Sequence, residues 1–467
     1  MATRFKKVLG RWDLLLFTVC AILVLDTVPS SAAMGMQTFF WWVVTLFLFF
    51  IPYGMITAEL GSAIPNQGGM YVWIRRAFGD TAGSMASWLY WINVAYWMPS
   101  VYVLFAGTFA SLFFPKMSTW GQIGIAIIMV WLTVYFGILS LGSSKHIPNI
   151  GAIAKVVVLL FLGVIGIWSV VHKGFANPFS VRSLFPSWSD TLGFLPVVVY
   201  NYMGFELMSS AGEEMKNPKK DVPRAIFIAG ALIFFFYVIG SWGILASLPL
   251  DKISIVTGII DSIKTVMSNF GATTGGIVTT IFGIIILYTF FANMVTWSIG
   301  ANRMIAATAT EGNFPKIMGH LNKRYATPDM AYIITGIVGT LLLIGNGLLS
   351  NSSANIFWTI FALSSLVFLL PYLLLFPAFL KLRKTEPNLP RPYRVPGGNK
   401  TAWILAILCE FFVAIACIFF FQPTPDVKNV FSYEAQLIIV TILTVLVGYV
   451  LYKWSIKRYK KSGEVSQ

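Results

Sequence analysis

Long apolar stretches recur along the whole chain and are separated by short polar segments. Each is long enough to cross the roughly 30 Å hydrocarbon layer of a bilayer as a helix, whereas a membrane β-barrel would show alternating stretches of about ten residues. The pattern therefore predicts about twelve spanning helices. We place them at residues 14–36, 39–63, 83–114, 121–141, 147–171, 192–214, 225–248, 275–309, 328–349, 355–382, 402–421 and 433–453.

Composition agrees with an all-α polytopic membrane protein. Hydrophobic residues make up 57% of the chain and charged residues only 11%, whereas soluble domains are about a quarter charged. The segments between the spans leave no room for a soluble domain. The first apolar stretch lacks a small-residue cleavage site, so we expect it to be a span and not a signal peptide.

The net charge of +15 is explained by where the basic residues lie, not by nucleic-acid binding. Lysine and arginine gather at both termini and in alternate loops, while the other loops are nearly neutral. This positive-inside pattern predicts a multi-pass protein of the cell membrane with both termini in the cytoplasm. The clusters lie at residues 4–11, 75–76, 145, 216–224, 323–324, 381–400 and 453–461.

The sequence offers no constellation for catalysis or metal binding. Cys20, Cys409 and Cys417 lie inside apolar runs, and the three histidines are scattered. There is no P-loop, no zinc-protease helix motif and no nucleophile elbow. We therefore expect no enzyme activity, no cofactor and no metal, and any uphill transport would have to use ion or solute gradients.

Two of the predicted spans are interrupted. In the first, Asp26 precedes Pro29, which cannot donate a backbone hydrogen bond; in the sixth, Gly204 lies between Asn201 and Glu206. Either interruption alone could be an ordinary kink. Because the first and sixth spans are five apart, the pair favours two inverted five-helix repeats with a substrate at the midplane.

Ionisable residues within the spans are candidates for function, since charges are costly in a bilayer. Asp26, Lys155 and Glu206 lie deepest. A structural alternative is that Lys155 pairs with a carboxylate. For the acids near loops, pairing for stability is the favoured interpretation; these are Glu59, Glu213 and Glu214.

Aromatic residues make up 16% of the chain, and most are expected to pack or to line the membrane interface. Trp297 differs because it lies mid-span, one helical turn after Asn293. The third span adds further aromatic residues that would suit a cation–π site. Residues 251–270 carry a helical apolar stripe and predict a short helix lying on the extracellular surface.

Several loop motifs resemble those of the amino acid–polyamine–organocation transporters, over nearly the whole chain. They lie at residues 59–74, 212–226, 300–304, 311–316 and 391–398. The resemblance implies alternating access without ATP. It also implies a five-plus-five inverted repeat, with repeats at 14–171 and 192–382, trailing helices at 402–453 and a cytoplasmic tail at 454–467.

Residues 50–54 and 98–99 look most like the glutamate/GABA antiporters. Trp297 resembles the substrate-covering tryptophan of arginine/agmatine antiporters, and Tyr200 and Glu206 resemble their gating aromatic and proton-sensitive acid. Lys155 resembles a lysine that replaces sodium in some relatives. The predicted substrate site comprises Asp26, Thr27, Ser30, Ser31, Trp97, Tyr102, Tyr200, Asn201, Gly204, Glu206, Asn293, Trp297 and Trp358, with Lys155 and Glu206 coupling ions or protons.

One departure from the family concerns the first interruption. Amino-acid transporters of the family usually carry Gly-Ser-Gly there, and bare backbone donors hold the substrate carboxylate. This chain has Asp-Thr-Val-Pro-Ser-Ser at residues 26–31, so a carboxylate would be repelled and an ammonium attracted. We expect an exchanger of amines, or of amino acids and their decarboxylated amines.

Two other functions fit the sequence less well. A neutral amino-acid permease would use the hydroxyls of Ser30 and Ser31 on the substrate carboxylate. A sensor or scaffold without transport activity would lack any attached soluble domain to signal through. Small-residue pairs in the spans suit packing within one chain or a homodimer equally.

Overall fold

The computed structural model describes residues 9–139, 145–186, 195–349, 352–422 and 430–462. Regular structure in these ranges is helical, and the one isolated β-bridge joins Leu9 to Met215. Within these ranges, eleven segments are long and apolar enough to cross a membrane. The twelfth predicted span is the interrupted sixth, which consists of two short pieces. The prediction of an all-α polytopic membrane protein is confirmed.

The spans are formed by α1 (Arg11–Ile22) with η1 (Leu25–Thr27) and α2 (Val28–Ala32), by α3 (Gln37–Thr45) with η2 (Leu46–Phe50) and α4 (Ile51–Ala63), by α6 (Asp80–Phe113), α7 (Thr119–Ile138) and α9 (His146–Lys173), and by α11 (Leu195–Tyr200) with η4 (Leu207–Glu214). They continue with α12 (Pro218–Ser247), α14 (Ala272–Thr310), α15 (Asp329–Leu349), α16 (Ser353–Leu369) with α17 (Tyr372–Thr385), α18 (Gly398–Phe419) and α19 (Val430–Ser462). Shorter elements connect them: α5 (Met70–Phe78), α10 (Val181–Leu184), η5 (Leu250–Lys252), α13 (Gly258–Met267), η6 (Ser268–Phe270) and η7 (Lys316–Gly319).

Most helix ends lie within a few residues of the predicted spans. The largest difference is α19, which continues to Ser462 although the predicted span ends at 453. Its basic continuation contains no glycine or proline before that point, so nothing stops the helix as it leaves the apolar layer. The short helix expected within 251–270 is α13, and its apolar stripe, including Ile259 and Ile263, is buried against the bundle.

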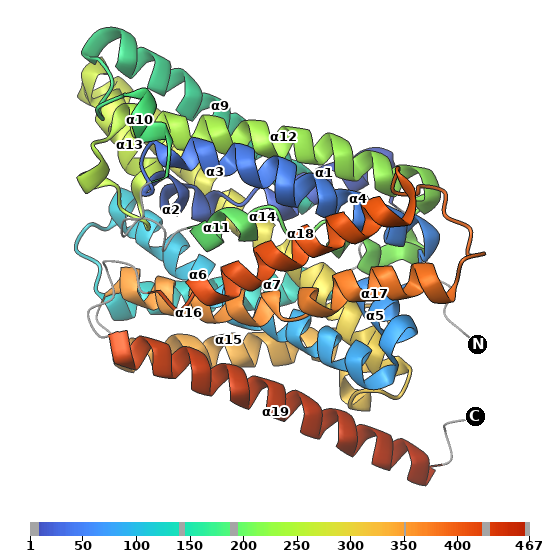
Figure 1. Ribbon diagram of the computed structural model, residues 1–467. Coiled ribbons are helices and arrows are strands. Elements are labelled where there is room, and N and C mark those ends of the chain that lie inside the picture. Colours follow the sequence, from blue (N-terminus) through green and yellow to red (C-terminus); the bar gives the residue numbers. More distant parts are fainter. Residues whose placement is uncertain (1–8, 140–144, 187–194, 350–351, 423–429, 463–467) are drawn as a thin grey trace.

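Burial separates central helices from peripheral ones. In the segment Arg11–Ala32, 89% of the most apolar window is buried, whereas the value for Val430–Tyr459 is 22%. Accordingly, α19 runs along the edge of the bundle in Figure 1, while α6 and α14 pass through its middle. A helix buried on all sides inside a membrane protein contacts protein in place of lipid, so it can carry polar groups that lipid would not tolerate.

The two ends of the bundle differ in charge. We call the end that carries α5 and the last turn of α17 the basic end, and α10 and α13 lie at the opposite end (Figure 1). Arg75 and Arg76 of α5 and Arg383 and Lys384 of α17 lie at the basic end. This grouping follows the alternation of basic and neutral loops along the sequence. A cytoplasmic location for this end stays a prediction.

Candidate substrate site at the helix breaks

The first break leaves backbone carbonyls that need partners. Helix α1 ends at Ile22, and the chain is extended at residues 23–24 before η1 begins. The last carbonyls of a helix have no partner within the helix, and in the buried centre they cannot turn to bulk water. Three side chains from three other helices supply the missing donors. The carbonyls of residues 20, 21 and 22 accept, in that order, from Lys155 Nζ (2.5 Å), Trp297 Nε1 (2.8 Å) and Tyr237 Oη (2.5 Å).

Tyr237 of α12 spans the break on its own. Its hydroxyl donates to the carbonyl of Ile22 and accepts from the N–H of Val24 at 2.7 Å, so it bridges the interrupted backbone. The sequence prediction missed this residue. In an apolar run rich in phenylalanine, one mid-span tyrosine is indistinguishable from a packing residue, and only the position of its hydroxyl reveals the role.

The second break is closed in the same manner by Tyr53 of α4. Its hydroxyl accepts from the N–H groups of Gly204 (3.0 Å) and Phe205 (3.1 Å). Gly204 has φ +108°, and a Cβ there would lie 2.9 Å from the ring of Trp297. Glycine is therefore required both by the backbone conformation and by the approach of the indole ring.

Glu206 follows this break and is fully buried. Its carboxylate accepts hydrogen bonds from three tyrosine hydroxyls, those of Tyr53, Tyr90 (2.7 Å) and Tyr372 (2.5 Å). We call these three residues the tyrosine cage. The sequence prediction placed Glu206 in the site but missed all three tyrosines. Tyr53 had a visible signal, since it lies in the 50–54 motif that resembles the antiporters.

The two broken segments contact each other directly. The Thr27 hydroxyl donates to Asn201 Oδ1 at 2.7 Å, and Asn201 Nδ2 donates to the Ser31 hydroxyl at 3.4 Å. Ser31 in turn donates to the carbonyl of Thr27 at 3.1 Å. Three of the predicted site residues, from segments far apart in the sequence, are thus brought together.

Asp26 lies beside this junction and is 2% exposed. Neither of its carboxylate oxygens has a hydrogen-bond partner among the described residues, and the Ser30 hydroxyl is likewise unpartnered. The carboxylate interacts electrostatically with Lys155 and Tyr200. The cavity next to it measures about 10 Å³, which is room for about one water molecule. The described residues therefore close around an acid that makes no hydrogen bond to any of them.

Aromatic rings form one wall of this region. Trp97 lies edge-on to Tyr200 (ring centroids 5.9 Å apart) and to Trp297 (5.3 Å). Trp97 Nε1 lies near the Asp26 carboxylate but outside ordinary hydrogen-bond geometry, and within the described chain neither Nε1 nor the Tyr200 hydroxyl has a partner. Buried polar atoms are rarely left unpaired. Their concentration around one carboxylate indicates a place for a polar ligand.

Among the described residues, Lys155 makes no ion pair with a carboxylate, which was the structural alternative. In the described part of the chain its ammonium donates to the Cys20 carbonyl and to Asn293 Oδ1 at 2.8 Å. Backbone carbonyls at unwound helix ends, like that of Cys20, are groups with which broken helices coordinate sodium. Asn293, predicted in the site, thus lies beside Lys155.

Two predicted site residues lie further out. The hydroxyl of Tyr102 pairs with Thr133 of α7, away from the broken segments. Trp358 packs against Phe361 at 5.7 Å between centroids, and Phe361 in turn packs against Tyr200.

The acids near loops behave largely as expected for stabilising pairs. Glu59 binds Arg383 at 2.6 Å, and Glu214 binds Arg303 at 2.7 Å. Glu213 is exposed, and its backbone N–H donates to Gln67. These pairs tie spans together at the basic end, whereas Asp26 and Glu206 lie buried at the helix breaks.

Comparison with known proteins places this chain in a family. A family model described as amino acid permease matches residues 9–447. The chain belongs to the amino acid permease family. This family forms part of the amino acid–polyamine–organocation superfamily, so the resemblance drawn from the loop motifs is confirmed.

Individual members of the permease family align over almost their full length. A probable agmatine/putrescine antiporter of Lactococcus lactis is 33% identical, covering 96% of this chain and 95% of that protein. An uncharacterised transporter of Legionella pneumophila is 30% identical, and the alignment covers 96% of this chain and 97% of that protein. A glutamate/gamma-aminobutyrate antiporter of Lactococcus lactis is 23% identical, and the alignment covers 97% of this chain and 92% of that protein. The chain is therefore a multi-pass membrane transporter.

Proposed function

We propose that this permease exchanges small amines, or an amino acid against its decarboxylated amine, and recognises their ammonium group at Asp26. The observation that carries the proposal is a buried carboxylate that has no hydrogen-bond partner among the described residues, beside Trp97 and Tyr200 and between two broken helices. An ammonium would meet the charge of Asp26 and the faces of the aromatic rings together. The similarity to a relative named as an agmatine/putrescine antiporter supports the same substrate class.

The charge at Asp26 also discriminates against carboxylates. Two unit charges 4 Å apart interact by about 4 kcal/mol at an effective dielectric constant near 20. The sign is favourable for an ammonium and unfavourable for a carboxylate. One backbone donor at the break is already engaged, because the N–H of Val24 is bound by Tyr237.

A neutral amino-acid permease is the second candidate, and Ser30 is the observation in its favour. The Ser30 hydroxyl has no partner within the described residues and could donate to a carboxylate. Ser31, the other hydroxyl in that hypothesis, already donates its proton to the carbonyl of Thr27. The amine hypothesis therefore needs fewer rearrangements of the first break.

The position of Lys155 supports transport without sodium. Its ammonium donates to the Cys20 carbonyl and to Asn293 Oδ1. The charged side chain thereby occupies the place that a bound cation would otherwise take beside those oxygens. A fixed ammonium can hold the unwound end of α1 in place through the whole cycle. Coupling would then fall to exchange or to protons, and the tyrosine cage of Glu206 is the candidate proton site.

The two tyrosine bridges support the predicted inverted repeat. Tyr237 lies in the seventh span and closes the break in the first, while Tyr53 lies in the second span and closes the break in the sixth. In the predicted repeat, span one corresponds to span six and span two to span seven, so the two tyrosine bridges are equivalent. We infer repeats at 14–171 and 192–382, and alternating access by movement of one set of helices against the other.

Exchange in proteoliposomes tests the proposal. Vesicles containing purified protein are loaded with unlabelled agmatine, putrescine, alanine, glutamate or buffer, and uptake of labelled agmatine is measured without sodium. We expect uptake from agmatine- or putrescine-loaded vesicles and background uptake from those loaded with buffer. Exchange of labelled alanine but not of amines would favour the permease hypothesis, and strict sodium dependence would contradict the role given to Lys155.

A further inference from the structure

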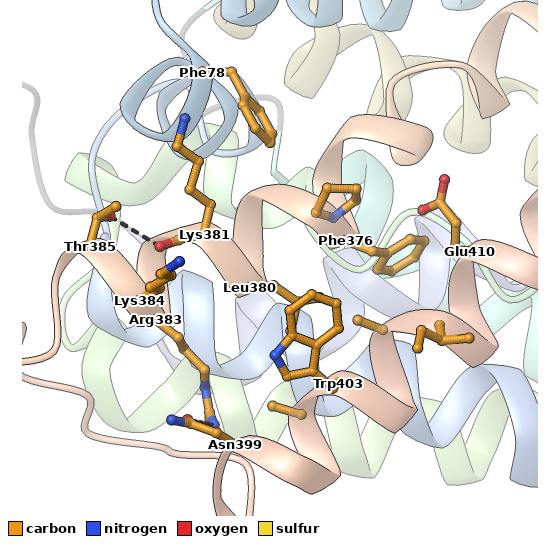
Figure 2. Close-up of a pocket in the computed structure, with 14 residues that line it drawn as sticks. Phe78, Phe376, Leu380, Lys381, Arg383, Lys384, Thr385, Asn399, Trp403 and Glu410 are labelled. Carbon is orange, nitrogen blue, oxygen red and sulfur yellow. Dashed lines mark hydrogen bonds between the residues drawn. The ribbon is translucent and has the colours of Figure 1, made fainter.

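A second cavity lies far from the helix breaks, at the basic end, between α17 and α18. It measures about 730 Å³ and is open on one side. We call it the α17–α18 slot. Figure 2 shows Arg383 and Lys384 at one end and Phe376 with Glu410 at the other, with Trp403 and Leu380 between them. A slot that is basic at one end and mainly apolar along its length, with the carboxyl of Glu410 at its far end, matches an amphiphile.

The charge at the slot's basic end is not neutralised. Arg383 is 8% exposed and is held by Glu59, so it belongs to the structure of the bundle. Lys384 is exposed and has no ion-pair partner among the described residues. The nearby carboxylate of Glu386 is bound to Arg76 at 2.6 Å. Lys381, also exposed, lies over the ring of Phe78 at 4.8 Å, which leaves its charge available.

The start of α18 adds backbone donors to this end. Its first turn has no side-chain cap, so its N–H groups face outward with the positive end of the helix dipole. Asn399 lines the slot here, and its Oδ1 accepts from Arg383, which leaves its amide N–H₂ group as a donor. Lysines, an amide and an uncapped helix start together favour a phosphate.

The remainder of the slot suits hydrocarbon. Its floor is made by small buried residues of α18, Ala402 and Ala406, and Ile407 lies at its open side with 59% exposure. Trp403 is 57% exposed, as expected for a side chain at the membrane interface. From Asn399 to Glu410 the helix rises by about 16 Å, close to the hydrocarbon depth of one leaflet.

We propose that the α17–α18 slot binds one anionic phospholipid, with its phosphate at Lys381, Lys384 and the start of α18 and an acyl chain along Ala402 and Ala406. The lipid would come from the leaflet at the basic end. Its position next to the Arg383–Glu59 pair connects it to the packing of α17 against α4. The slot is separate from the candidate substrate site, and the lipid proposal does not depend on the proposed exchange function.

Native mass spectrometry of the full-length protein tests the proposal with two lipids that share acyl chains. Dioleoylphosphatidylglycerol and dioleoylphosphatidylcholine are titrated in detergent, and we expect one tight site for the anionic lipid. Lys381→Gln with Lys384→Gln should weaken it by roughly fivefold per lysine, the effect of about 1 kcal/mol per charge near an anionic lipid. Ala406→Leu, which fills the slot, should weaken both lipids.

The matched control is Lys219→Gln with Lys220→Gln, two exposed lysines of α12 that lie outside the slot. This control should keep the affinity of the wild type for phosphatidylglycerol. Equal loss in both double variants would overturn the proposal in favour of diffuse surface charge. Displacement of the lipid by inorganic phosphate would overturn the proposal in favour of an anion site. Dimers that form only when the slot holds no lipid, and that Ala406→Leu abolishes, would overturn it in favour of a second copy of the chain.

Discussion

At the scale of single residues, the most consequential side chains are those that complete the broken backbone. Tyr237 and Tyr53 each bond two backbone groups that would otherwise be unpaired in the buried centre. A buried polar group left without a partner costs about 1–3 kcal/mol. The two hydroxyls therefore make the interruptions tolerable, and they hold the residues that face the substrate site.

We expect Tyr237→Phe to lower the thermal stability of the purified protein, since the Ile22 carbonyl and the Val24 N–H both lose their partner. The cost should be about 2–4 kcal/mol, and agmatine affinity should fall because the segment bearing Asp26 is released. Tyr433→Phe is the control: it removes a buried 2.7 Å hydrogen bond to the Phe420 carbonyl, at peripheral α19. It should lower stability without changing affinity; equal affinity losses in both variants would contradict the bridging role.

The sequence pointed to the charged residues of the candidate site but not to the hydroxyls that bridge its helix breaks. Asp26, Lys155 and Glu206 stood out because ionisable groups are rare in apolar runs. Tyrosine is common in this chain, and sequence spacing does not show which hydroxyl meets a backbone gap. The partner of Lys155 was hidden for a related reason, because the Cys20 carbonyl is available only once α1 has ended.

At the scale of elements, length and apolarity predicted the spans, because crossing the hydrocarbon layer sets a minimum helix length. The course of the sixth span was not predictable in the same way. After Gly204 it continues as the 3₁₀ helix η4, which leads toward the ion pair of Glu214 with Arg303. This conformation depends on contacts with other helices, chiefly the Tyr53 hydroxyl and the Trp297 ring.

Gly204→Ala tests whether the sixth break is shaped by the indole ring. A methyl group there meets both the positive φ and the Trp297 ring at 2.9 Å. Gly271→Ala is the matched control, since its φ is +84° and nothing lies within 4 Å of a Cβ. We expect thermal denaturation to show a loss of roughly 1–2 kcal/mol for Gly271→Ala. Gly204→Ala should lose more of the free energy of unfolding and should also bind agmatine less tightly. Equal losses of stability in the two variants, with unchanged agmatine binding, would argue against the ring contact.

At the scale of the whole molecule, the structure is closed around Asp26. The residues beside its small cavity include some from α6 and α14, Ile255 before α13 and Ile259 within α13. At the basic end, Glu59 and Glu214 join spans through buried ion pairs. Under the proposed function, substrate reaches Asp26 only by a movement of helices, as alternating access requires. The central claim is that the charge of Asp26 selects what enters.

The most direct measurement is equilibrium binding of agmatine to Asp26→Asn, with Asp251→Asn, an exposed acid near α13, as the control. Asparagine keeps the size of the side chain and removes the charge. We predict that agmatine affinity falls at least about a hundredfold in Asp26→Asn, as expected for loss of a close charge pair, and is unchanged in Asp251→Asn. Unaltered agmatine affinity in a folded Asp26→Asn protein would contradict the account.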